Sequence, residues 1–275
     1  MSWIEVMALG ALQGVTEFLP VSSSGHLALA EHLFGVHHPQ TLFDLCLHLG
    51  TLVAVIGFFM APLKDTLTGT IAWIGSIARG QTPSADQTSS ARVAGLVLVG
   101  SVPAGIVGLV WGHRLEAWAT DSSVVGVLLI LNGIMLLSTL PALLEWTKTR
   151  PVARLSVVGA LLIGVAQSLA ILRGVSRSGS TISAARQMGL SAVDSARFSF
   201  FLFIPAIIGA LLLEMSHGWP EGVSLGPTQA LVGGIVAMIT GVLALKLLMR
   251  VLRAGRLYWF GPYCIAIGLV TLLTQ

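Results

Sequence analysis

Six apolar segments, each close to the length that crosses a lipid bilayer, constrain the fold of this chain more than any other feature. A membrane-spanning helix needs about 20 apolar residues, with a range of roughly 17 to 25. The segments that approach or meet this length are 43–60, 91–111, 121–141, 197–215, 227–249 and 257–274. Because 55% of the residues are hydrophobic and only 10% are charged, the chain cannot cover itself with polar surface in water. We therefore predict an all-α polytopic membrane protein with six full spans, folded as a single membrane domain over 1–275.

Two further apolar regions, 3–34 and 155–191, are interrupted near their middles. The first break reads Glu-Phe-Leu-Pro-Val-Ser-Ser-Ser-Gly-His over 17–26, and the second reads Arg-Gly-Val-Ser-Arg-Ser-Gly-Ser over 173–180. Each half is too short to cross a bilayer comfortably. We predict that both regions form re-entrant helix hairpins, which enter the membrane and return on the same side.

The two broken regions are also copies of one another. When the sequence is shifted without a gap so that Gly10 meets Gly164, further identical residues coincide. Gln13, Val21, Ser22, Ser24, Gly25, Ala30 and Gly35 then meet Gln167, Val175, Ser176, Ser178, Gly179, Ala184 and Gly189. Each copy is followed by three of the six expected spans, which gives a first repeat over 1–141 and a second over 155–275. Because three is an odd number of crossings, the second repeat must be inverted relative to the first, as in many transporters.

The basic residues of the expected loops are concentrated on one side of the membrane. The side on which the first hairpin opens carries only Arg114. The opposite side carries Lys64, Arg79, Arg92, Lys148, Arg150, Arg154, Arg186, Arg197, Arg250, Arg253 and Arg256. Basic loops favour the cytoplasm, so we predict that both termini lie outside and that the tips of the two hairpins meet within the membrane. The net charge of +3 is less informative than this distribution along the loops, and no nucleic-acid partner is expected.

Ionisable residues at the two tips are the main candidates for chemistry. Glu17, His26, Arg173 and Arg177 lie in otherwise apolar regions, where a charged group costs several kcal/mol unless it is paired or hydrated. A structural salt bridge between Glu17 and Arg177 is the simplest alternative interpretation. It does not explain the hydroxyl groups around them, which belong to Ser22, Ser23, Ser24, Ser176, Ser178, Ser180 and Thr181.

The broken helices are suited to binding an anion. A new half-helix is expected near Ser23 and another near Ser178, and the free N–H groups at a helix N-terminus bind phosphate. The guanidinium of Arg177 adds a planar fork that matches phosphate oxygens. Ser23 and His26 are spaced i, i+3, which places them on one face of a helix, where the histidine could act as base or acid toward the hydroxyl.

Two further polar pairs have open roles. Gln13 and Glu17 are spaced i, i+4 and could hold Mg²⁺ or Ca²⁺ jointly with a substrate phosphate, although polar helix packing explains Gln13 equally well. Asp44 and His48 form a second i, i+4 pair at the head of the first span. Support of the site and plain hydrogen bonding between helices are both open for this pair.

These motifs resemble those of the bacterial undecaprenyl diphosphate phosphatases of the BacA or UppP type. The similar stretches are 13–26 and 174–181, together with Phe43-Asp44 and 48–51, and the resemblance covers nearly the whole chain. It implies an enzyme of the bacterial plasma membrane that converts undecaprenyl diphosphate, an isoprenoid diphosphate lipid, to undecaprenyl phosphate, the lipid carrier for peptidoglycan precursors. It also implies a divalent-cation requirement, an active site that opens outward, and bacitracin resistance when the protein is overproduced.

The resemblance also assigns roles by position. It implies catalytic roles for Glu17 and His26, a catalytic or binding role for the Ser23 hydroxyl, and a diphosphate clamp formed by Ser176 and Arg177. We count Glu17, Ser23, His26 and Arg177 as the catalytic set, with the nucleophile left open between Ser23, His26 and water. The expected substrate-binding residues are Ser22, Ser24, Gly25, Ser176, Ser178, Gly179 and Thr181. Gln13 and Glu17 are the expected metal ligands, although the family allows glutamate or glutamine where this chain has Gln13, which leaves one carboxylate. The alternative function is an inverted-repeat transporter of a lipid phosphate or an anion, and whether the chain forms a homo-oligomer stays open.

Overall fold

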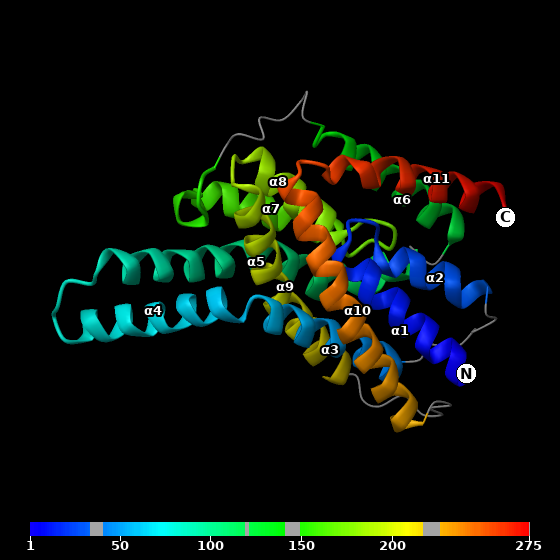
Figure 1. The fold of residues 1–275 in the computed structure, drawn as a ribbon, viewed down its shortest axis with the longest axis horizontal. Helices are drawn as coiled ribbons and strands as arrows, with labels where there is room; N and C mark the ends of the chain where they lie inside the picture. Colours follow the sequence, from blue (N-terminus) through cyan, green and yellow to red (C-terminus); the bar gives the residue numbers. More distant parts are fainter. Residues whose placement is uncertain (34–40, 119–120, 141–148, 217–225, 275) are drawn as a thin grey trace.

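The computed structural model describes residues 1–33, 41–118, 121–140, 149–216 and 226–274. Within these ranges the chain is built from the α-helices α1 to α11, joined mostly by short turns (Figure 1). Gly35 and the last residue of the expected segment 121–141 lie outside the described residues. The prediction of an all-helical protein is confirmed for the described residues, which contain no β-strand.

The two predicted breaks are present, and each has a local cause. The first region forms α1 (Trp3–Phe18) and α2 (Ser23–Leu33), and the second forms α7 (Val157–Leu169) and α8 (Arg177–Gln187). Pro20 disfavours helical geometry at the residue before it, so α1 ends there. The chain then turns through Ser22, whose φ of 71° lies in the left-handed region. In the second region Gly174 takes a φ of 107°, a conformation that glycine adopts without strain.

The expected spans correspond to helices of unequal length. The remaining elements are α3 (Thr41–Phe58), α4 (Met60–Ala78), α5 (Ala85–Trp118), α6 (Ser122–Leu137), α9 (Ala192–Ser216), α10 (Pro227–Arg253) and α11 (Phe260–Leu273). Three helical stretches among the described residues, in α5, α9 and α10, are long and apolar enough to cross a membrane by themselves. The helices α3 and α4 meet this combined requirement of length and hydropathy only together, as a pair bent by 75°, and α6 and α11 are shorter apolar helices. Six full spans therefore remain a prediction.

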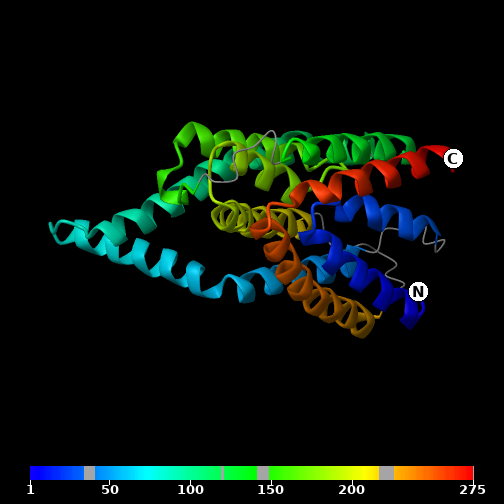
Figure 2. The same ribbon diagram turned by 45° about the horizontal axis from the view of Figure 1, so that its top comes forward.

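The helix α4 was not predicted. It runs antiparallel to the first part of α5, and both views show this pair extending away from the body of the molecule (Figures 1 and 2). Its polar residues Lys64 and Asp65 interrupt the apolar pattern just after 43–60, so the pattern predicts no span there. The exposed apolar residues of α4, such as Leu67, Ile71 and Ile74, are typical of a helix that contacts lipid.

Glycines allow the helices to approach closely where they cross. An ideal Cβ atom at Gly10 of α1 would lie 2.6 Å from the carbonyl oxygen of Gly233 in α10. In the pair α6 and α11, a Cβ at Gly133 would lie 2.6 Å from the carbonyl oxygen of Gly261. Such contacts between small residues are how helices pack in membranes, where apolar burial gives little driving force. This packing holds α1 of the first hairpin against α10, and α6 against α11.

Candidate active site

The tips of the two hairpins meet through an ion pair. Glu17 lies in the last turn of α1, and Arg177 is the first residue of α8. The Arg177 Nη2 atom donates to Glu17 Oε1, and the Glu17 side chain is 2% exposed. The guanidinium also lies over the ring of Phe203, 4.2 Å from its centroid. The sequence-based suggestion that these two charges pair is therefore confirmed.

Hydrogen bonds between the two breaks reinforce this contact. The N–H of Gly174 donates to Ser22 Oγ over 3.1 Å, and Ser178 Oγ donates to the carbonyl oxygen of Leu19 over 3.3 Å. Each break therefore satisfies a polar group of the other. Because unpaired polar groups are costly away from water, these bonds hold the tips in one register.

Asn132 of α6 joins both breaks and was not predicted from the sequence. Its Nδ2 donates to the carbonyl oxygen of Pro20 over 3.0 Å, and its Oδ1 accepts from the N–H of Ser176 over 2.9 Å. The side chain is 1% exposed. A lone asparagine in the apolar segment 121–141 was the available signal, because such a residue in a membrane helix usually has a polar partner.

The carboxylate of Glu17 collects several donors. Besides Arg177, Ser23 Oγ donates to Oε2 over 2.5 Å, and Gln13 Nε2 donates to the same oxygen over 3.1 Å. An ionised carboxylate accepts such bonds and donates none, so the arrangement suits the charged form. The residue that accepts the hydroxyl hydrogen of Ser23 is therefore Glu17.

His26 has different partners from those expected. Its Nδ1 lies 2.8 Å from the carbonyl oxygen of Ser22, and its Nε2 lies 2.9 Å from the hydroxyl of Tyr263 on α11. The two rings are stacked, with centroids 5.7 Å apart. Because a carbonyl can only accept, Nδ1 carries the hydrogen and Nε2 accepts from Tyr263. Among the contacts of the described residues there is no hydrogen bond between His26 and Ser23, so the expected serine–histidine pair is not formed in this structure.

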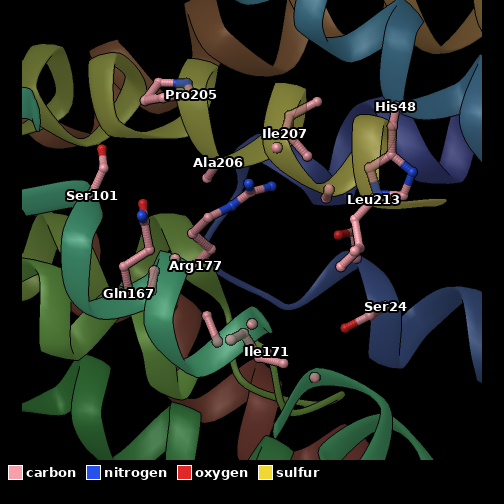
Figure 3. A pocket seen from close by; sticks show the side chains of 18 of the residues that line it. Ser24, His48, Ser101, Gln167, Ile171, Arg177, Pro205, Ala206, Ile207 and Leu213 are labelled. Atoms are coloured by element: carbon pink, nitrogen blue, oxygen red, sulfur yellow. The ribbon is translucent and has the colours of Figure 1, made fainter. Parts of the chain in front are cut away.

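A cavity of about 530 Å³ lies beside the ion pair. Figure 3 shows Arg177 in its centre, with Ser101 and Gln167 on one side and Ser24 and His48 on the other. Its polar lining residues are Thr16, Glu17, Ser23, Ser24, His48, Ser101, Gln167, Ser176, Arg177 and Glu214. The rest of the wall is apolar and comes mainly from α5 and α9. A charged headgroup with an apolar tail matches this division of the lining.

His48, whose role the sequence left open, belongs to the cavity wall. Its Nδ1 donates to the carbonyl oxygen of Asp44 over 2.8 Å, so its Nε2 is the nitrogen available to accept. The contact between these two residues, four positions apart, is thus made by the backbone carbonyl of Asp44, and this hydrogen bond orients the imidazole of His48.

Several of the predicted substrate-binding residues form hydrogen bonds within the protein. Ser22 and Ser176 cap the two half-helices, because each Oγ accepts from the backbone N–H of the glycine three residues on, Gly25 over 3.3 Å and Gly179 over 3.1 Å. The hydroxyl of Thr181 pairs with Ser199 over 2.5 Å. The hydroxyl of Ser178 lies 3.1 Å from Ser176 Oγ. Of the predicted set only Ser24 and Ser176 line the cavity, and a role in ligand binding stays a prediction for all of its members.

The protein oxygens at this site could coordinate a divalent cation only together with oxygens from a bound substrate or water. Among the described residues there is no group of three or more histidine, cysteine, aspartate or glutamate side chains that could hold a metal ion. Gln13 is fully buried and is not part of the cavity lining, but its Oε1 has no hydrogen-bond partner among the described residues, which leaves one oxygen for such an ion. Mg²⁺ is commonly bound by one or two carboxylates together with substrate phosphates and water, so the pair fits a shared site.

Comparisons with known proteins extend over the whole chain. The family model described as "Bacitracin resistance protein BacA" matches residues 6–270. A protein named undecaprenyl-diphosphatase from Desulfatibacillum aliphaticivorans is 39% identical, with 100% of this chain and 99% of the relative covered. Proteins of the same name from Desulfosudis oleivorans and Mycobacterium bovis are 40% and 36% identical; both alignments cover 98% of this chain, and they cover 97% and 95% of the relatives. The similarity therefore includes the framework as well as the tip motifs.

Proposed function

This chain belongs to the BacA family of bacitracin resistance proteins, and we propose that it hydrolyses undecaprenyl diphosphate to undecaprenyl phosphate and inorganic phosphate. Its relatives carry the name undecaprenyl-diphosphatase over almost their full lengths. The observation that carries the proposal is the group formed by Glu17, Ser23 and Arg177 on the wall of a cavity that is polar around these residues and apolar elsewhere. The reaction recycles the lipid carrier for cell-wall synthesis, and overproduction gives bacitracin resistance.

In the proposed reaction, the terminal phosphate binds beside Arg177 and the N-terminal ends of α2 and α8. The guanidinium turns part of its fork from Glu17 to the phosphate oxygens, where it stabilises the charge that develops in the transition state. Phosphoryl transfer needs mainly positioning and electrostatic stabilisation, and this site offers both.

Ser23 is the nucleophile in this reaction. As its Oγ bonds to the terminal phosphorus, Glu17 accepts the hydroxyl proton and the phosphoanhydride bond breaks, releasing undecaprenyl phosphate. Water then hydrolyses the phosphoserine, which releases inorganic phosphate and restores the hydroxyl. His26 is proposed as a further acid–base group. For its Nε2 to transfer a proton to or from the reacting oxygens, the hydrogen bond between Nε2 and the Tyr263 hydroxyl must first break.

Glu17 and Gln13 Oε1 would hold Mg²⁺ or Ca²⁺ together with the substrate. When bound, the cation supplies further neutralisation of the phosphate oxygens. The orphaned amide oxygen of Gln13 supports this site.

The membrane arrangement proposed from the sequence is an inverted repeat of 1–141 and 155–275, with six spans, both termini outside and the site open outward. The equivalent capping of α2 by Ser22 and of α8 by Ser176 supports the duplication. The long pairings of α1 with α10 and of α7 with α5 are also equivalent under it. Single cysteines introduced in 142–153 should react only from the cytoplasmic side, and those in 216–226 only from outside. Labelling of 216–226 from the cytoplasm contradicts this topology.

The activity can be tested with purified protein in detergent micelles. Phosphate release from undecaprenyl diphosphate is measured in the presence of Mg²⁺. Ser168→Ala is a folding-matched control, because within the part of the chain that the structure describes its hydroxyl bonds only the carbonyl oxygen of Gly164. An enzyme turns over without a compartment, whereas a carrier does not. Absence of phosphate release from folded protein that moves a lipid phosphate across vesicles would overturn the proposal in favour of the transporter.

A further inference from the structure

Gln167 presents an unpaired carboxamide to the cavity. The residue lies in the last turns of α7 and is 3% exposed, and it belongs to the cavity lining. Neither its Oε1 nor its Nε2 has a hydrogen-bond partner among the described residues. Buried polar side chains are nearly always hydrogen-bonded, so a side chain with both amide atoms unpaired points to a partner that arrives from outside the protein.

The equivalent residue of the first hairpin shows what is missing. Gln13 occupies the same place in α1, and its Nε2 donates to Glu17, four residues on. The residue four positions after Gln167 is Ile171, which offers no side-chain acceptor. The amide is therefore satisfied within the protein in one hairpin and left unsatisfied in the other.

The position of Gln167 fits a second phosphate. In Figure 3 Gln167 and Ser101 lie on one side of Arg177, while Ser24 lies on the other, next in sequence to Ser23. The Ser101 hydroxyl donates to the carbonyl oxygen of Val97 and so has no hydrogen to offer a phosphate, which leaves Gln167 as the donor of this pair. The Nε2 of Gln167 offers two donors without adding charge, and phosphate oxygens are acceptors.

We infer that the carboxamide of Gln167 binds a phosphate group of the lipid diphosphate, on the side of Arg177 opposite Ser24. This inference rests on the proposed function and deepens it, because it gives the two phosphates separate places: one beside Ser23 and Glu17, the other between Arg177 and Gln167. Arg177 then lies between them and contacts both.

The decisive variant is Gln167→Met, which keeps the length of the side chain and removes its hydrogen bonds. We expect KM for undecaprenyl diphosphate to rise at least about tenfold with kcat changed much less, because a hydrogen bond to a charged group is lost in both the bound state and the transition state. The melting temperature of the ligand-free protein should stay the same or rise, because an unpaired buried amide is removed. Ser168→Ala, one residue on, should keep the KM of the native chain.

Two further measurements separate binding from support of the fold. Inorganic pyrophosphate should raise the melting temperatures of the native chain and of Ser168→Ala. It should raise the melting temperature of Gln167→Met much less. Gln167→Glu, which places a negative charge beside the phosphate, should raise KM more than Gln167→Met does. Because Ser23 attacks the terminal phosphorus, Gln167 is expected to contact the lipid-bound phosphate. Undecaprenyl phosphate should therefore inhibit Gln167→Met less than the native chain, whereas weaker inhibition by inorganic phosphate alone contradicts this arrangement.

The outcomes also separate this inference from the proposed function. A native chain that releases no phosphate refutes the proposed function itself. If the native chain is active while Gln167→Met keeps its KM and its stabilisation by pyrophosphate, only the role of Gln167 is refuted. A lower melting temperature with unchanged KM likewise refutes the role of Gln167 in binding, because the amide then serves the fold.

Discussion

Ser23 donates its hydroxyl hydrogen to Glu17 Oε2 over 2.5 Å, while the other oxygen of the same carboxylate pairs with Arg177. One carboxylate thus connects the nucleophile proposed for the reaction with the residue proposed to bind phosphate. When phosphate draws Arg177 away, Glu17 loses a positive neighbour and becomes a better acceptor for the Ser23 proton. Substrate binding and activation of the serine are coupled in this geometry.

This coupling predicts strong non-additivity between Ser23 and Glu17. Ser23→Ala and Glu17→Gln should each lower kcat at least about a hundredfold, and the double variant should be little worse than either one, because the two residues act as one unit. Phosphate release at saturating lipid diphosphate and Mg²⁺ measures this, with melting temperatures to confirm folding. Losses that multiply, with substantial activity left in Ser23→Ala, would show that water attacks directly.

Arg177→Lys tests the planar fork. Lysine keeps the charge but cannot donate two parallel hydrogen bonds to a phosphate, so activity should fall at least about tenfold. The variant should still fold, because the ammonium can pair with Glu17. Near-native turnover would reduce Arg177 to a structural partner of the carboxylate.

Tyr263→Phe tests whether the phenol positions His26. The variant keeps the stacked ring and loses the hydrogen bond to Nε2, which is worth roughly 1 kcal/mol, so we expect about a fivefold loss of kcat. In a His26→Ala background the same change should have no further effect, because the residue it positions is gone. An equal loss in both backgrounds means that Tyr263 acts independently of His26.

Asn132→Leu should separate the two tips. It leaves the N–H of Ser176 without its partner, which costs about 1–3 kcal/mol for a buried group, and it leaves the carbonyl of Pro20 with only the weak thiol donor of Cys264 at 3.7 Å. We expect the free energy of unfolding in detergent to fall by about 2–4 kcal/mol and activity to fall with it. Asn132→Asp keeps the acceptor for Ser176 and should therefore be less damaging. Unchanged stability of Asn132→Leu contradicts the bridging role.

The sequence predicted those features of the fold and of the site that neighbouring residues determine. Pro20, Gly174 and the hydroxyl groups beside them break two apolar regions, and charges within such regions must pair, so the hairpins and the contact of Glu17 with Arg177 could be foreseen. The partner of His26 could not, because Tyr263 is 237 residues away and nothing in the spacing of Ser23 and His26 excludes a direct bond. The helix α4 was missed because its polar residues interrupt the apolar pattern, although the chain continues as a helix after a sharp bend at the end of α3.

The glycines of α5 give a test of where the isoprenoid tail lies. Gly105 lines the cavity, and an ideal Cβ there would meet no atom within 4 Å. Gly95 of the same helix has equally open surroundings but is not part of the lining, which makes it a matched control. Gly105→Leu should raise KM for undecaprenyl diphosphate at least about fivefold because the added side chain occupies the apolar wall, whereas Gly95→Leu should leave KM unchanged.

Chain length distinguishes the tail from the headgroup. If Gly105 faces the tail, farnesyl diphosphate, whose chain is far shorter, should be affected less than undecaprenyl diphosphate. Kinetics with both substrates, at equal detergent concentration and with melting temperatures to confirm folding, measure the difference. Equal increases of KM for both substrates would place the obstruction at the phosphates, and equal effects of Gly95→Leu and Gly105→Leu would remove the tail from this wall of the cavity.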